Sequence, residues 1–198
     1  LAMYLKTDAV AAFFDQRAET WDAHSSPRED VVNTILDTAG ITRGVSVLDV
    51  GCGTGVLFPY YLARSAASIT GVDLSPAMIA QAKGKFGSDP RVKLLCGDAT
   101  VLVFSIHDTC VVYNALPHVQ SAQALIEALS KALVPGGRLT IAHGDGRQVV
   151  NARHSSGASE VSRDLMPASE LAELFDPQFE VDAVHDAEDY YLVSGILK

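Results

Sequence analysis

The sequence has few basic residues, few aromatic residues and no long apolar run. Only 15 of its 198 residues are lysine or arginine, against 24 aspartates and glutamates, so the formal net charge is −9 at pH 7. Such a surface repels phosphate backbones, and no cluster of basic residues offsets it, so we expect no nucleic-acid partner. No apolar stretch approaches the roughly 18 residues of a membrane-spanning helix, so we expect no membrane insertion.

Cysteine is also scarce. Cys52, Cys96 and Cys110 are odd in number and show no CxxC spacing, so we predict free thiols rather than a disulfide framework. The first residues lack a basic segment followed by an apolar core, the mark of a secretory signal. We therefore expect a cytoplasmic protein. Its length suits one compact domain.

Short apolar runs alternate with helical patterns from residue 45 onward. Strands are predicted at 45–50, 68–73, 92–96, 110–114, 138–143, 179–185 and 190–198. Helices are predicted at 9–21, 28–39, 56–65, 76–86, 121–133 (closed by Pro135-Gly136-Gly137) and 168–175. This alternation predicts an α/β fold with a Rossmann-like, doubly wound, seven-stranded sheet that is mostly parallel. The last two strands are joined too closely for a parallel crossover, so the C-terminal hairpin should contribute an antiparallel strand.

The pattern also predicts an internal organisation. Residues 1–40 are expected to form an N-terminal helical lid, and residues 41–198 the core. Within the core, residues 144–167 are predicted to form an excursion over the carboxyl edge of the sheet, where they would shape an acceptor site.

A glycine-rich segment follows the first predicted strand. Asp49-Val50 leads into Gly51-Cys52-Gly53-Thr54-Gly55, where glycines permit a sharp turn and close approach of a ligand. The spacing is GxGxG, and Val56 stands where a dinucleotide fingerprint would place its last Gly or Ala. A tight structural turn without a ligand is the alternative interpretation.

Carboxylates follow the next two strands. Asp73, in Gly-Val-Asp-Leu-Ser, can accept hydrogen bonds from both hydroxyls of a ribose. Its alternative role, as a helix N-cap, is better filled by Ser75. Asp98, in Gly-Asp-Ala, can accept from an exocyclic amine, although a solvated turn aspartate is the alternative.

Two further segments complete the pattern: Val-Val-Tyr-Asn-Ala-Leu-Pro-His at 111–118 and Leu-Val-Pro-Gly-Gly-Arg-Leu at 133–139. In this order, the five elements resemble the class I S-adenosylmethionine-dependent methyltransferases over residues 45–143. The segment FFDQRAETWDAH is similar to the opening helix of the small-molecule branch, which includes the ubiquinone and menaquinone methyltransferases. The resemblance implies S-adenosylmethionine as cofactor and methyl transfer to a small-molecule acceptor.

The resemblance also implies roles for individual residues along the bound cofactor. At the amino-acid end it implies Asp49, with Gly51 and Gly53 beneath. At the nucleoside it implies Asp73 for the ribose, Leu74 and Met78 against the adenine, and Asp98 and Ala99 for the adenine amine. Asn114 is implied near the sulfonium, and Trp21 and Tyr4 above the cofactor. The chain has little room for a separate substrate domain, which favours a small acceptor.

Three histidines are candidate catalytic residues: His118, His143 and His154. A neutral histidine can take a proton from a thiol, phenol or amine acceptor. A metal site and a purely structural role are the alternatives. Because the sequence lacks the carboxylate-rich cation site of catechol-type methyltransferases, no metal is predicted. Arg147 and Asn151 share a helix face with His154 and are predicted to contact the acceptor.

Two other functions fit part of the pattern. A nicotinamide-dependent oxidoreductase shares the glycine turn and the ribose carboxylate, but the GxGxG spacing and Asp98 count against it. A non-catalytic sensor or scaffold that binds S-adenosylmethionine is also compatible, since the motifs concern binding alone. The sequence leaves the oligomeric state and the acceptor's identity open.

Overall fold

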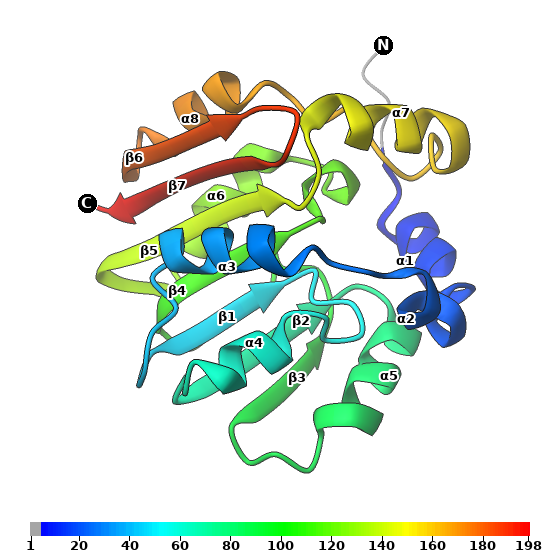
Figure 1. Ribbon diagram of the computed structural model, residues 1–198, viewed down its shortest axis with the longest axis horizontal. Helices are drawn as coiled ribbons and strands as arrows, with labels where there is room; N and C mark the ends of the chain where they lie inside the picture. Colours follow the sequence, from blue (N-terminus) through cyan, green and yellow to red (C-terminus); the bar gives the residue numbers. More distant parts are fainter. Residues whose placement is uncertain (1–4) are drawn as a thin grey trace.

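A seven-stranded sheet lies at the centre of the computed structural model, which describes residues 5–198 (Figure 1). Its strands are β1 (Ser46–Val50), β2 (Ser68–Asp73), β3 (Val92–Cys96), β4 (His107–Tyr113), β5 (Leu133–His143), β6 (Phe179–Asp186) and β7 (Tyr191–Leu197). Their spatial order is β3-β2-β1-β4-β5-β7-β6. The order reverses between β1 and β4, which is where doubly wound sheets bind ligands.

The pairing of the strands confirms the predicted mixed sheet. The pairs β1–β2, β1–β4, β2–β3 and β4–β5 are parallel, whereas β7 runs antiparallel to both β5 and β6. The short β6–β7 connection forces a hairpin there. The predicted fold class is therefore confirmed.

Helices cover both faces of the sheet (Figure 1). On one face lie α3 (Glu29–Thr38), α4 (Phe58–Ala63) and α5 (Pro76–Phe86); on the other lie α6 (Ala122–Ser130) and α8 (Ala168–Phe175). The apolar residues of α3 illustrate the cause: Val32, Ile35 and Leu36 recur at helical spacing and are at most 1% exposed. Ser75 caps α5 as predicted, because its hydroxyl accepts from the Met78 amide at 3.1 Å.

The predicted helix over 9–21 is wrong in its continuity. The chain forms α1 (Thr7–Asp15), a 3-10 turn η1 (Ala18–Thr20) and the short α2 (Trp21–His24). The break allows Trp21 to pack edge-on against Phe14, with ring centroids 5.6 Å apart. This tertiary contact overrides the local helical pattern.

The predicted end of the helix over 121–133, closed by Pro135-Gly136-Gly137, is also wrong. α6 ends at Ser130, and these three residues lie inside β5. The β4–β5 pairing shifts register between His107 and Thr109, opposite this stretch. Gly136 adopts a φ of +76°, which its lack of a side chain permits.

The N-terminal helices and α7 (Arg147–Gly157) lie beyond the carboxyl ends of the parallel strands (Figure 1). α7 lies within the predicted excursion over residues 144–167. Within residues 5–198, no helix combines the length and apolar character needed to cross a membrane.

Candidate functional site

The glycine turn after β1 forms the floor of the site. Gly51 has a φ of +71°, and a Cβ added there would lie 2.5 Å from the Ala115 Cβ. Gly53 has a φ of +54°, and an added Cβ would meet nothing within 4 Å. Gly51 is therefore fixed by protein packing, whereas Gly53 faces open space that a ligand can occupy.

Asp73 joins this turn to the next one. Its Oδ2 accepts a hydrogen bond from the Gly53 amide at 2.8 Å, and its Oδ1 accepts from the Ser75 amide at 2.9 Å. Each oxygen has a second lone-pair direction, so the carboxylate can still accept from two hydroxyls. Burial raises the pKa of Asp73, and the two amides oppose that rise.

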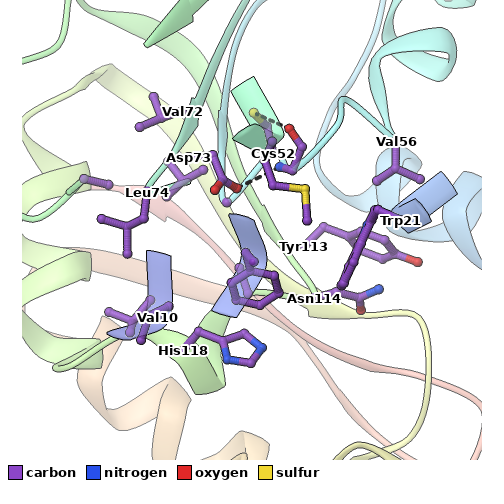
Figure 2. Close-up of a pocket in the computed structure, with 18 of the residues that line it drawn as sticks. Val10, Trp21, Cys52, Val56, Val72, Asp73, Leu74, Tyr113, Asn114 and His118 are labelled. Carbon is purple, nitrogen blue, oxygen red and sulfur yellow. Dashed lines mark hydrogen bonds between the residues drawn. The ribbon is translucent and has the colours of Figure 1, made fainter. Parts of the chain in front are cut away.

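A cavity of about 610 Å³ opens above these turns. In Figure 2, Val72, Asp73 and Leu74 lie on one side of it, and Trp21, Tyr113 and Asn114 on the other. The cavity lining includes most of the residues predicted to bind the cofactor: Trp21, Gly51, Gly53, Asp73, Leu74, Met78, Asp98, Ala99 and Asn114. Tyr4 lies outside the described residues.

Asp98 lies at the cavity end near Leu74. Its Oδ1 accepts from the Thr100 amide at 2.8 Å and from the Thr100 hydroxyl at 2.7 Å. These local bonds orient the carboxylate and leave Oδ2 available to a donor such as an exocyclic amine.

Asp49 lies beneath the glycine turn rather than in the cavity lining. It is 2% exposed, and its Oδ2 has no hydrogen-bond partner. Burial raises the pKa of Asp49 to about 7, an effect that the Tyr61 hydroxyl opposes and the Asp73 carboxylate reinforces. The unpartnered Oδ2 of this buried carboxylate is free to accept a hydrogen bond from a cationic group above it.

Asn114 follows β4 with a φ of +54°, the left-handed region that few residues other than glycine adopt. Its Oδ1 accepts from the Gly144 amide at 2.9 Å, and its own amide donates to the Ala142 carbonyl at 2.9 Å. These bonds hold a strained turn across the ends of β4 and β5, and strain of this kind is typical of ligand sites.

His118, at the end of the 3-10 turn η2 (Leu116–His118), lines the same cavity. Its Nδ1 lies 2.9 Å from the Val161 carbonyl oxygen, which can only accept, so Nδ1 carries the proton. Burial lowers the pKa of His118 to about 4, so the ring is neutral and Nε2 keeps its lone pair.

The other two histidines are placed differently. His143 is 2% exposed, lacks a partner for Nε2 and packs edge-on against Tyr191 instead of lining the cavity. Burial lowers the pKa of His143 to about 3. The His154 ring lies 5.0 Å from that of His118 but borders a separate shallow hollow. Within residues 5–198, no group of three His, Cys, Asp or Glu side chains is placed to hold a metal ion.

The structure does not bring the predicted acceptor residues of α7 into the cavity. Arg147 pairs with Asp186, with Nε 3.1 Å from Oδ2. Asn151 accepts from the Leu165 amide at 2.7 Å and donates to its carbonyl at 3.2 Å. The two side chains therefore bond to the end of β6 and to the segment after α7 instead of contacting the cavity.

Several cavity-lining residues were missed by the sequence reasoning: Phe14, Arg28, Tyr113 and Arg153. Arg28 donates to the carbonyls of Gly144, at 2.8 Å, and of Asp189, and it takes part in none of the ion pairs found in the described part of the chain. No local pattern marks this arginine, because its surroundings come from the ends of β5 and β6.

Two aspartates fasten the N-terminal helices over the cavity. Asp15 accepts from the Ser75 hydroxyl at 2.5 Å and from the Ala77 amide at 3.0 Å, at the start of α5. Asp22 accepts from the Thr54 hydroxyl at 2.5 Å within the glycine turn. The helices are thus bonded to both turns that Asp73 joins.

Residues 47–137 match the family model described as a methyltransferase domain. Among curated proteins, the malonyl-[acyl-carrier protein] O-methyltransferase of Priestia megaterium is 34% identical over 131 residues, which cover 64% of this chain and 47% of the relative. The demethylmenaquinone methyltransferase of Tropheryma whipplei is 34% identical over 147 residues, which cover 68% and 59%. The chain thus spans about half the length of these relatives.

Solved structures share the fold. The N-methyltransferase NodS from Bradyrhizobium japonicum, in complex with S-adenosyl-L-homocysteine, superposes with a TM-score of 0.74 at 14% identity and covers 95% of this chain and 98% of that one. A putative methyltransferase structure, the complex with the Haloferax volcanii Trm112 activator, gives 0.76 at 20% identity and 97% coverage of both chains. Together with the ordered motifs from Asp49 to Gly137, these matches show that residues 47–137 form a methyltransferase domain, and the fold is the one that S-adenosylmethionine-dependent methyltransferases share.

Proposed function

We propose that this chain binds S-adenosylmethionine and transfers its methyl group to a small-molecule acceptor. One observation carries the proposal: a single cavity is lined by Asp73 and Asp98 and also by Asn114 and His118. The two aspartates offer the acceptors that a nucleoside needs, and the other two residues offer a strained turn and a neutral base. The names of the curated relatives support the same reaction class.

The nucleoside of the cofactor fits the part of the cavity lined by Asp73 and Asp98. Asp73 would accept from the ribose hydroxyls, Asp98 from the adenine amine, and Leu74 and Met78 would contact the adenine faces. All four residues line the cavity, and Met78 is 1% exposed, so a flat apolar ring would meet a well-packed wall.

The amino-acid end of the cofactor carries one charge of each sign. The unpartnered Oδ2 of Asp49 would attract the ammonium, directly or through a water molecule, with Gly51 and Gly53 beneath. Arg28 reaches the cavity without a carboxylate partner of its own and would attract the carboxylate. The residues present therefore fit a zwitterionic cofactor.

When bound, S-adenosylmethionine supplies a methyl group already activated by a sulfonium. The residues of this chain then need to align a nucleophile with that methyl group and to exclude water from it.

Residues 1–40 would act as a lid, since α1 and Trp21 line the cavity roof. Residues 144–167 would close the acceptor end through Gly144, Asp145 and Arg153 instead of the predicted Arg147 and Asn151. We still expect the reducing cytoplasm, since Cys52, Cys96 and Cys110 are free.

Trp21 is the chain's one tryptophan and lines the cavity, so its fluorescence reports occupancy directly. Titration with S-adenosylmethionine should change this signal and saturate, whereas NAD should not.

Asp73→Ala removes two charge-assisted hydrogen bonds, each of about 1.5–3 kcal/mol, and should weaken binding at least 100-fold. Asp89→Ala, at an exposed ion pair with Arg91 outside the cavity, is the control and should bind normally.

Formation of S-adenosylhomocysteine over a panel of small molecules then tests catalysis. Tight cofactor binding without turnover on any panel member would favour a sensor or scaffold. Saturable NAD binding without S-adenosylmethionine binding would overturn the proposal in favour of an oxidoreductase.

A further inference from the structure

The turn over residues 115–120, which follows β4 and contains η2, is held from two sides. Within it, the His118 amide donates to the Ala115 carbonyl and the Val119 amide to the Leu116 carbonyl, each at 3.0 Å. A single 3-10 turn has little stability of its own, because few hydrogen bonds offset the entropy of ordering it. The conformation of the 115–120 turn therefore depends on the segments that pack against it.

The proposed lid supplies the contacts on one side. The Leu5 amide donates to Gln120 Oε1 at 2.6 Å, and Leu5 is 2% exposed. On α1, the Phe14 ring packs edge-on against the His118 ring, with centroids 4.9 Å apart. Phe14 also contacts Trp21, and both rings line the cavity. A ligand that holds these two rings in place therefore acts on the 115–120 turn through its lid-side contacts.

Residues 154–163, at the end of α7 and after it, supply the contacts on the other side. The Arg163 amide donates to the Pro117 carbonyl at 2.8 Å, and His118 Nδ1 donates to the Val161 carbonyl at 2.9 Å. The His154 ring packs edge-on against the His118 ring, with centroids 5.0 Å apart. His118 thus belongs to both sets of contacts, and its ring meets one aromatic ring from each covering of the cavity.

We infer that the 115–120 turn couples the two coverings of the site, so that cofactor bound beneath the lid orders residues 154–163. A ligand that fixes Phe14 and Trp21 gives the turn a fixed neighbour on the lid side, and residues 154–163 then pack against a better ordered turn. The inference rests on the proposed function, which puts the cofactor in the cavity beneath these rings. Coupling of this kind is reciprocal, so an acceptor molecule that orders residues 154–163 should strengthen cofactor binding by the same factor.

Hydrogen exchange of the full chain, with and without saturating S-adenosylhomocysteine, tests the inference. Residues 154–163 are absent from the cavity lining, and the Arg163 amide reports directly on its bond to the Pro117 carbonyl. We expect exchange in this segment to slow about 5- to 10-fold on binding, which lies within the usual range of coupling between sites. Trp21 fluorescence shows in the same sample that the cavity is occupied.

Two variants cut the coupling from opposite sides. His154→Ala removes the ring that α7 presents to His118, and Gln120→Ala removes the acceptor of the Leu5 bond. In each variant, S-adenosylhomocysteine should slow exchange in residues 154–163 less than about twofold. Val149→Ala changes a side chain of α7 that is 47% exposed, so it is the matched control and should keep the full wild-type effect.

Exchange measured without ligand shows whether His154→Ala has loosened α7 itself. If it has, Gln120→Ala decides, because that change lies outside α7. Unchanged exchange in residues 154–163 of the wild-type chain while Trp21 reports saturation would overturn the inference and leave the proposed function standing. The full effect in both His154→Ala and Gln120→Ala would also overturn it. Absence of S-adenosylhomocysteine binding would instead overturn the proposed function, and the inference with it.

Discussion

Asp22 on α2 accepts a hydrogen bond from the Thr54 hydroxyl at 2.5 Å, and so links the N-terminal helices to the glycine turn. Its other oxygen accepts from Lys85 Nζ at 2.6 Å, which extends the link to α5. Thr54 is buried, with 1% of the residue exposed, whereas the Asp22 side chain is 53% exposed. Neither residue lines the cavity, so the bond fastens the N-terminal helices from outside it.

We predict that Asp22→Ala accelerates release of S-adenosylhomocysteine about 3- to 10-fold, because the helices lose a charge-assisted bond to the turn. Stopped-flow fluorescence of Trp21 measures the release rate. Asp37→Ala removes a similar ion pair with Arg64, 2.6 Å long, on α3. Since that pair joins α3 to the end of α4 and does not involve the N-terminal helices, equal acceleration in both variants would show that Asp22 does not act through the lid.

The glycine turn allows a paired prediction about stability. Gly51→Ala should destabilise the fold by about 1–3 kcal/mol, because the new Cβ would lie 2.5 Å from the Ala115 Cβ and φ is +71°. Gly84→Ala, within α5 and with nothing within 4 Å of an added Cβ, should stabilise by up to about 1 kcal/mol. Urea denaturation of both variants measures these shifts. A neutral Gly51→Ala would contradict the packing argument.

The sequence predicted the structure best where interactions between neighbouring residues determine the backbone conformation. The helix over residues 76–86 was predicted in full, because Ser75 and Pro76 mark its start by capping and by a fixed φ. The glycine turn and Asp73 were found for a similar reason, since their spacing alone places them at adjacent strand ends. The predicted cofactor residues therefore line one cavity almost completely.

The acceptor end was predicted less well, because its residues meet only through tertiary contacts. Arg147 and Asn151 share a helix face, but Val150, 4% exposed, turns that helix so that they bond to neighbouring segments. Phe14 and Arg28 reach the cavity from helices that dock on it from far along the chain. Helical periodicity identifies an apolar face but not what the face packs against.

Buried histidines predict a loss of stability in acid. The pKa of His143 is about 3 in the folded chain and about 6.5 when unfolded, so the unfolded state binds the extra proton between these values. Stability should therefore fall as pH drops from about 6.5 towards 3, by at most about 1.4 kcal/mol per pH unit for this residue.

His143→Leu removes that titration, so its advantage over the wild-type chain should grow as pH falls from 6.5 to 4.5. Chemical denaturation at several pH values measures the difference. His185→Gln, at a half-buried site on the surface, removes no fully buried imidazole; it serves as the control and should alter the pH dependence much less. A constant difference between His143→Leu and wild type across this range would mean that His143 is already protonated in the fold.

Asp49 should couple cofactor binding to the release of a proton. Burial raises its pKa to about 7, so the carboxyl beneath the glycine turn titrates near neutral pH in the free chain. An ammonium group above it favours the ionised form, so binding must expel that proton. Affinity should therefore weaken as pH falls from 8 to 6, by at most tenfold per pH unit. The heat of S-adenosylmethionine binding, measured by calorimetry at pH 7, should differ between two buffers with different ionisation enthalpies. In Asp49→Asn the two heats should be equal. Identical heats in both buffers for the wild-type chain would place the ammonium elsewhere.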